Sequence, residues 1–255
     1  MGVDLGEWIV GLRSNDEEIL DLLWRGLAPI RVDDIPVFPN LSLFRSADER
    51  GKRELHRLYR RGVTVLRTGS PGRMLRAAAR HLDGFLTPPA DLLPLRAELL
   101  VGGHGAVLVY DTAASLHLPH RRLAKMGWRR TEGAVCRFDP ETLEVVVPEP
   151  RFAFDPVVAA EIDERWPREP DEGGVAPGRF PVHAVVLLGT RPDHLRVASP
   201  ARRLASLASL LDTSFHPARA VEVEAVGRLD GSAEVVRALG YEANEVIDIL
   251  RSLSA

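Results

Sequence analysis

The spacing of apolar residues along the first third of the chain predicts a small α+β unit over residues 1–90. Apolar residues alternate with small or polar ones where we expect strands, and they recur at helical spacing where we expect helices. The expected elements are a strand at 8–12, a helix at 15–28, strands at 41–44 and 63–67, and a helix at 71–82.

Two sequence signals mark where these helices begin. Ser14 is followed three positions later by Glu17, which is the spacing of a capping box, so we expect Ser14 to be the N-cap of the first helix. Ser70 precedes Pro71, and proline is favoured at the first position of a helix. We therefore expect Ser70 to cap the second helix.

The remainder of the chain, residues 91–255, predicts a larger domain built around buried strands. Continuous apolar runs at 95–101, 105–110 and 183–189 are typical of strands covered on both faces, and we expect them in one sheet. Residues 167–180 are rich in proline, glycine and acidic side chains, which predicts a mobile loop with no apolar anchor. The other expected elements are a helix ending at Gly127, a hairpin of 135–139 with 143–150, a helix opened by Ser199 and Pro200, a strand at 219–227, and helices at 232–240 and 244–253.

Composition and charge exclude several classes of protein. The chain has 255 residues and a net charge of -3, which argues against a nucleic-acid binder driven by electrostatics. It has a single cysteine, Cys136, so it can form neither an internal disulfide nor a cysteine-based zinc cluster. Its apolar runs are far shorter than the roughly 20 residues of a membrane helix, and its first residues lack the pattern of a signal peptide. We therefore expect a cytoplasmic protein with no membrane segment.

The isolated histidines and the cysteine are expected to have structural roles. His117 and His120 are three positions apart, but a proline lies between them and no third ligand is near, so no metal site is predicted. His104 lies in a Gly-Gly-His-Gly turn, where a solvated side chain is expected. Cys136 lies within a predicted strand and is expected to be a small core residue.

A series of short motifs in residues 91–255 resembles the C-terminal domain of HPr kinase/phosphorylase and its actinobacterial relatives. The motifs follow the order strand, turn, strand, loop, helix, Asp-Pro-Glu-Thr hairpin and Pro-x-Pro segment. The resemblance implies a phosphoenolpyruvate-carboxykinase-like fold with a mixed sheet, preceded by the accessory unit that these relatives carry. The matching positions are LRAE at 95–98, AVLV at 106–109, KMGW at 125–128, TEG at 131–133 and DPETLEV at 139–145.

The phosphate loop implied by this resemblance is degenerate. A P-loop needs glycines whose backbone N–H groups surround the phosphates, a lysine for the β- and γ-phosphates, and a Ser or Thr for magnesium. Here His117 stands near the lysine position, Leu118 stands near the hydroxyl position, and no glycine is present. Lys52 and Lys125, the two lysines of the chain, are not placed to serve. The vestigial loop comprises Asp111, Thr112, Ala113, Ala114, Ser115, Leu116, His117 and Leu118.

The second catalytic element of these relatives is also incomplete. Their acidic pair after the helix is represented by Glu132 alone, because Gly133 takes the second place, and Arg96 replaces an early histidine. His117 and Glu132 are the remaining catalytic candidates. Four arginines near the loop offer contacts to an anion or an acidic partner, with a solvated face as the simpler alternative. They are Arg121, Arg122, Arg129 and Arg130.

These observations favour a non-catalytic HPr-kinase-like binding or scaffold protein, and the resemblance implies a bacterial peptide-modification or natural-product pathway. Such a protein would bind a protein or peptide, alone or as a homo-oligomer, and would need no cofactor. Two alternatives remain open. One is an ATP-dependent kinase with an unconventional loop, in which His117 and arginines replace the lysine and magnesium is still used. The other is a small-molecule binder that reuses the old phosphate pocket.

Overall fold

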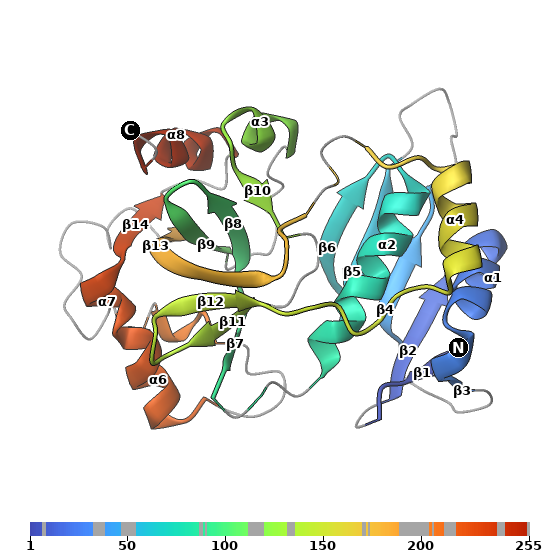
Figure 1. Ribbon diagram of the computed structural model, residues 1–255, viewed down its shortest axis with the longest axis horizontal. Coiled ribbons are helices and arrows are strands. Elements are labelled where there is room, and N and C mark those ends of the chain that lie inside the picture. The colour runs from blue at the N-terminus through green and yellow to red at the C-terminus, as the bar shows by residue number, and fades with distance from the viewer. Residues whose placement is uncertain are drawn as a thin grey trace. The chain divides into compact units, whose positions relative to one another are not determined.

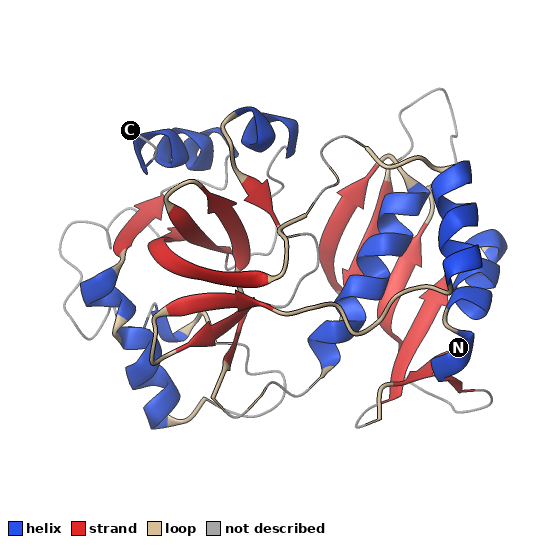
Figure 2. Cartoon of the chain, in the orientation of Figure 1, coloured by secondary structure: helices blue, strands red, loops and turns tan. Residues whose placement is uncertain are grey.

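The computed structural model is a mixed α+β structure with two mixed sheets (Figure 1, Figure 2). The chain divides into two compact units, of which the first combines Met1–Thr87 with Pro150–Gly173. The second combines Pro88–Thr131, Val135–Glu149 and Gly174–Ala255. The residues that the structure describes are 1–6, 9–32, 39–46, 55–86, 89, 91–111, 120–131, 136–169, 172, 174–188, 204–205, 207–211, 218–238 and 243–253.

The first unit contains a six-stranded sheet with the order β3-β1-β2-β4-β5-β6. Strands β2 and β4 are parallel, and the other neighbouring pairs are antiparallel. The strands are β1 (Gly2–Asp4), β2 (Ile9–Ser14), β3 (Arg31–Val32), β4 (Pro39–Phe44), β5 (His56–Arg60) and β6 (Val63–Thr68). The helices are α1 (Glu17–Gly26), α2 (Pro71–Leu82) and α4 (Pro156–Arg165), with short 3-10 turns η1 (Ala28–Ile30) and η2 (Asp83–Phe85).

The three helices of the first unit lie on one face of this sheet (Figure 1). Leu22 of α1, Met74 of α2 and Ile162 of α4 pack into one buried core with Leu43 and Leu58 of the strands. Because side chains alternate between the two faces of a strand, this core fixes which residues of each strand face the helices and which face the other way.

The helix caps confirm one sequence prediction and correct the other. Ser70 caps α2, and its side chain accepts a hydrogen bond from the backbone N–H of Arg73 at 3.3 Å. The predicted N-cap of α1 is wrong, because Asp16 caps that helix and accepts from the N–H of Ile19 at 3.0 Å. Ser14 cannot take the role because it is still paired in the sheet, as the last residue of β2.

The boundary between the units differs from the expected division at residue 90. Val158 and Ile162 of α4 are buried in the core of the first unit, so the chain returns to that unit after the second has begun. Sequence reasoning missed α4 and β5. Of the expected loop over 167–180, Gly178–Phe180 belong to a strand. The part before this strand does have an anchor, although of another kind than the apolar contact whose absence was predicted. The anchor is ionic, since Glu172 is buried and bound to Arg76.

The second unit contains an eight-stranded sheet with the order β10-β8-β9-β13-β12-β11-β7, and β14 pairs with β13. Strand β13 pairs with β12 through its first residues and lies between β9 and β14, parallel to both, through its last. The strands are β7 (Leu93–Leu95), β8 (Glu98–Gly102), β9 (Gly105–Asp111), β10 (Arg129–Arg130), β11 (Cys136–Asp139), β12 (Glu144–Val147), β13 (Gly178–Leu188) and β14 (Glu234–Ala238). The helices are α3 (His120–Lys125), α6 (Ala220–Gly227), α7 (Leu229–Ser232) and α8 (Ala243–Leu253).

The central strands of this unit lie as predicted. Strands β8, β9 and β13 are neighbours in one sheet, which confirms the expectation drawn from their apolar runs. The run at 95–101 is divided, however, because Leu95 ends β7 and Glu98 begins β8. The hairpin of β11 with β12 is confirmed. The helix expected after Ser199 begins outside the described residues.

The order of helix and strand near the C-terminus is the reverse of the prediction. Residues 219–227 alternate in polarity, yet they form helix α6, while Glu234–Ala238, expected to be helical, form strand β14. The buried positions from α6 to α7 are Glu222, Ala225, Val226 and Leu229, which is helical spacing. The alternation of valine and glutamate concealed this second pattern.

In the described part of the chain, no helix is long and apolar enough to cross a membrane.

Candidate functional site

Three parallel strands of the second unit end at one edge of its sheet. The register places Leu188 of β13 beside Asp111 of β9 on one side and beside Ala238 of β14 on the other. In open sheets of this kind, ligands bind beyond the carboxyl ends of parallel strands. The segment that the sequence predicts to be a vestigial phosphate loop follows β9 along the chain, and β9 ends at this edge.

Two helices support this edge from one face of the sheet. Leu123 of α3, together with Val246 and Leu250 of α8, packs on Val109 and Val186 of the central strands. Helix α3 begins at residue 120, directly after the segment 112–119. The strand, the connecting segment and the helix therefore follow one another as they do around a phosphate loop.

The residues expected to form the vestigial loop lie mostly outside the described residues. Asp111 is described only as the last backbone position of β9, and residues 112–118, with both catalytic candidates, His117 and Glu132, lie outside. Lys125 is the last residue of α3 and is exposed. The rise of an α-helix puts it about 7.5 Å along the axis from the start of α3.

The four arginines near the loop belong to two elements. Arg121 and Arg122 are on α3, where the side chain of Arg121 lies outside the described part and that of Arg122 is exposed. Arg129 and Arg130 form β10, and successive side chains of a strand point to opposite faces. Arg130 is ion-paired with Glu98 of β8, whereas Arg129 is exposed. Of the four arginines expected to form a cluster, the structure therefore shows Arg122 and Arg129 as exposed, while Arg130 is held by Glu98.

The cysteine of β11 has no reactive character. Cys136 is 2% exposed, as expected for a small core residue. Burial raises its pKa to about 12, although a hydrogen bond with the Thr131 side chain opposes the shift. A thiol with this pKa is not a nucleophile near neutral pH.

The turn that precedes β9 is structural. Gly102 and Gly105 bound the hairpin of β8 with β9, and His104 is exposed at its tip, as predicted. Gly105 has a positive φ of 119°, and a Cβ there would lie 2.6 Å from the carbonyl oxygen of Pro181. Within the described ranges, no group of three metal-ligating side chains comes together.

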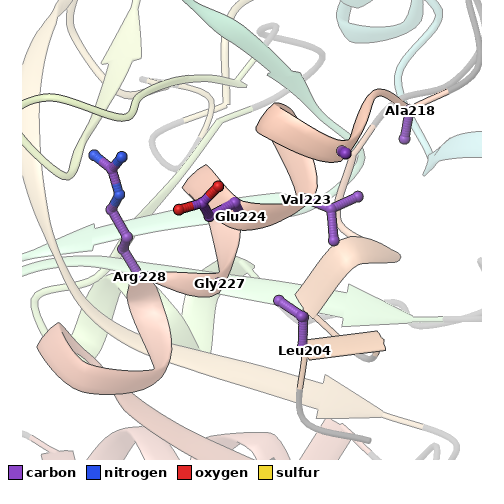
Figure 3. A pocket seen from close by; sticks show the side chains of 7 residues that line it. Leu204, Ala218, Val223, Glu224, Gly227 and Arg228 are labelled. Carbon is purple, nitrogen blue, oxygen red and sulfur yellow. The ribbon is translucent and has the colours of Figure 1, made fainter. Parts of the chain in front are cut away.

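A shallow cavity of about 510 Å³ lies on helix α6 of the same unit (Figure 3). Leu204 and Val223 lie opposite each other, and Glu224 and Arg228 extend on one side. Both charged side chains are exposed, and Arg228 donates a hydrogen bond to the carbonyl oxygen of Pro140. The described lining residues therefore offer an apolar surface but no buried polar group that would fix a ligand.

Sequence reasoning missed β14, the third of the parallel strands that end at this edge, because it assigned Glu234–Ala238 to a helix. The adjacent β-branched residues Val235 and Val236 were the available signal for a strand.

No family model, curated protein or solved structure matches this chain.

Proposed function

We propose that this protein is a non-catalytic, HPr-kinase-like binding or scaffold component of a bacterial peptide-modification or natural-product pathway, acting in the cytoplasm on a protein or peptide partner. The observation that carries the proposal is the sequence Asp-Thr-Ala-Ala-Ser-Leu-His-Leu over 111–118, directly after the central parallel strand β9. By the resemblance, this segment stands where a phosphate loop would lie, and it lacks the glycines, the lysine and the hydroxyl residue at the magnesium position.

The missing residues have a large expected effect on affinity for nucleotide. Loss of the lysine and of the hydroxyl removes two charge-assisted contacts, each worth about 1.5–3 kcal/mol. Together these amount to about 3–6 kcal/mol, which is about two to four decades in the dissociation constant. Asp111 adds a negative charge at the end of the strand. A site of micromolar affinity would thus bind MgATP near the millimolar range at best.

The test is isothermal titration with ATP and magnesium. We expect no measurable binding to the natural chain below millimolar concentration. A variant with His117→Lys and Leu118→Ser restores both lost contacts and is the matched comparison. Micromolar binding by the natural chain that disappears in His117→Ala would overturn the proposal and favour a kinase with an unconventional loop.

A further inference from the structure

The face of the six-stranded sheet opposite the helices carries a compact group of basic and aromatic side chains. Leu12, Leu43, Leu58 and Leu66 point into the core beneath α1, α2 and α4, so their neighbours along each strand point the other way. Figure 1 is viewed from the helix side, and this second face is turned away. We call it the open face, and its central residues are Arg13, Ser42, Phe44, Arg57, Tyr59 and Arg67.

Strand register places the members of this group beside one another. Phe44 of β4 is paired with Arg57 of β5, and Arg57 is paired in turn with Arg67 of β6. In the adjacent row, Arg13 of β2 is paired with Ser42, and Ser42 is paired with Tyr59. The residues come from four strands but form two neighbouring rows of one surface.

Contacts within the group join the aromatic rings to one arginine. The rings of Phe44 and Tyr59 meet edge to face, with centroids 5.5 Å apart and an interplanar angle of 83°. The guanidinium of Arg13 lies 5.8 Å from the centroid of Phe44, and its Nε donates to Ser42 Oγ at 2.8 Å. Phe44 is nevertheless 37% exposed, which leaves part of the aromatic surface in contact with solvent.

The pair Arg57 and Arg67 is unfavourable unless an anion binds to it. Like charges directly opposite on neighbouring strands repel, and both side chains are exposed. In the described part of the chain neither has an ion-pair partner, although other arginines, such as Arg25, Arg76 and Arg179, are paired with carboxylates. The guanidinium of an arginine is suited to a carboxylate, which it can bind through two N–H···O bonds.

Among the residues that the structure describes, few carboxylates lie on the face that carries Arg57 and Arg67. Alternation along the described strands places a single carboxylate on this face, that of Asp4, which is paired in register with Ile9 and accepts from the N–H of Gly6. Ile9 and Arg13 are four residues apart on β2, about 13 Å along the strand. Within the described strands, no carboxylate therefore neutralises Arg57 and Arg67.

From these contacts we infer that the open face binds an acidic peptide segment. A Glu or Asp of the peptide is held between Arg57 and Arg67, and an adjacent apolar or aromatic side chain lies on Phe44 and Tyr59. Single-stranded nucleic acid is the other polymer that combines anions with flat rings. It is disfavoured because neutralisation of phosphates by lysines and arginines supplies most of such binding, whereas the described strands place three arginines on this face and the chain has a net charge of -3.

This inference concerns the first unit and does not depend on the state of the nucleotide site. The probe is a fluorescein-labelled peptide in which glutamates alternate with tryptophan and phenylalanine, and its binding to the full chain is followed by fluorescence anisotropy. The matched probes are the same peptide with lysines in place of glutamates and a short oligothymidylate.

We expect the acidic peptide to bind and the lysine peptide not to bind. Arg57→Ala and Phe44→Ala should each weaken binding about tenfold. The double variant Arg57→Glu with Arg67→Glu should abolish it. A control with the same change of charge on exposed arginines elsewhere, Arg168→Glu with Arg251→Glu, should bind like the natural chain.

The fold of the variants is checked independently. Arg57→Glu alone replaces a repulsive pair by an attractive one, so we expect it to unfold at a higher urea concentration than the natural chain while binding the peptide more weakly. That combination cannot arise from misfolding. Absence of peptide binding to the natural chain, equal binding by the double variant, or tighter binding of the oligothymidylate than of the peptide would each overturn the inference.

Discussion

The segment Pro150–Gly173, which returns to the first unit, is anchored there by an ion pair between Glu172 and Arg76. Removing this ion pair is a quantitative test of the structure. Arg76 of α2 holds Glu172 through two contacts, Nε to Oε1 at 2.5 Å and Nη2 to Oε2 at 2.8 Å. Its Nη1 donates to Asp163 at 2.8 Å. The side chain of Glu172 is only 2% exposed and that of Arg76 only 10%. Replacing Arg76 by methionine keeps the apolar stem but leaves a buried carboxylate without its counter-ion.

The expected cost follows from that burial. Removing one partner of a buried ion pair typically destabilises by 3–5 kcal/mol. Glu172 keeps one hydrogen bond, from the backbone N–H of Glu169 at 3.0 Å, so we expect Arg76→Met to cost about 3 kcal/mol. With an m-value of about 1–3 kcal/mol per molar urea, the unfolding midpoint of the first unit should fall by about 1–3 M.

The matched control is Arg168→Met. Arg168 donates to the same Asp163 at 3.1 Å but is 67% exposed, so its loss should change stability by no more than about 0.5 kcal/mol. The double variant Arg76→Met with Glu172→Leu removes both charges and should recover most of the lost stability.

The measurement is urea unfolding followed by circular dichroism, together with tryptic cleavage after Arg168. Arg76→Met should expose this bond, because the anchor beside it is lost. If Arg76→Met and Arg168→Met unfold at the same urea concentration, the argument from burial is wrong. A double variant that is less stable than Arg76→Met would likewise contradict it.

Two further predictions concern titrating groups of the second unit. The hydrogen bond from Arg179 lowers the pKa of Asp139, as do the backbone N–H groups of Glu141 and Thr142. Because the pKa of Asp139 is lower in the folded chain than in the unfolded chain, its ionised carboxylate stabilises the fold at pH values above the unfolded pKa of about 3.9. This stabilisation is lost as the pH falls through the folded pKa. Urea unfolding at pH 7 and pH 3 should therefore show a smaller loss for Asp139→Asn than for the natural chain; equal losses would refute this. Burial and the raised pKa of Cys136 predict that Ellman's reagent at pH 8 titrates no thiol in the native chain and one equivalent in urea. Rapid reaction of the native chain would show that β11 is not buried as described.

Local sequence signals were sufficient where one short-range interaction dominates. Ser70 and Pro71 specified the start of α2, because a cap involves only the residues of the first turn. The continuous apolar run of β9 specified a strand buried on both faces, and residues 106–110 are all buried. The Asp-Pro-Glu-Thr turn specified the hairpin of β11 with β12, since Asp139 accepts from the N–H of Glu141 two residues on.

Tertiary structure decided the elements whose local signals were balanced. The sequence over 219–227 fits a strand by its alternation and a helix by the spacing of its buried residues, and the helix forms. The valines of β14 become a strand because β13 offers it a parallel partner in the sheet. Each segment carries a local signal for the structure that forms, but an opposing local signal balances it, so contacts with distant residues decide the outcome.

The candidate sites divide in the same way. The degenerate loop that we propose after β9 rests on residue types alone, because phosphate binding demands particular residues at particular spacings. The open face could not, since Arg13, Phe44, Arg57 and Arg67 are distributed over four strands and meet only through sheet register. The sequence determined which chemical groups this protein has, and long-range pairing determined which of them share a surface, because register is set by contacts between residues far apart along the chain.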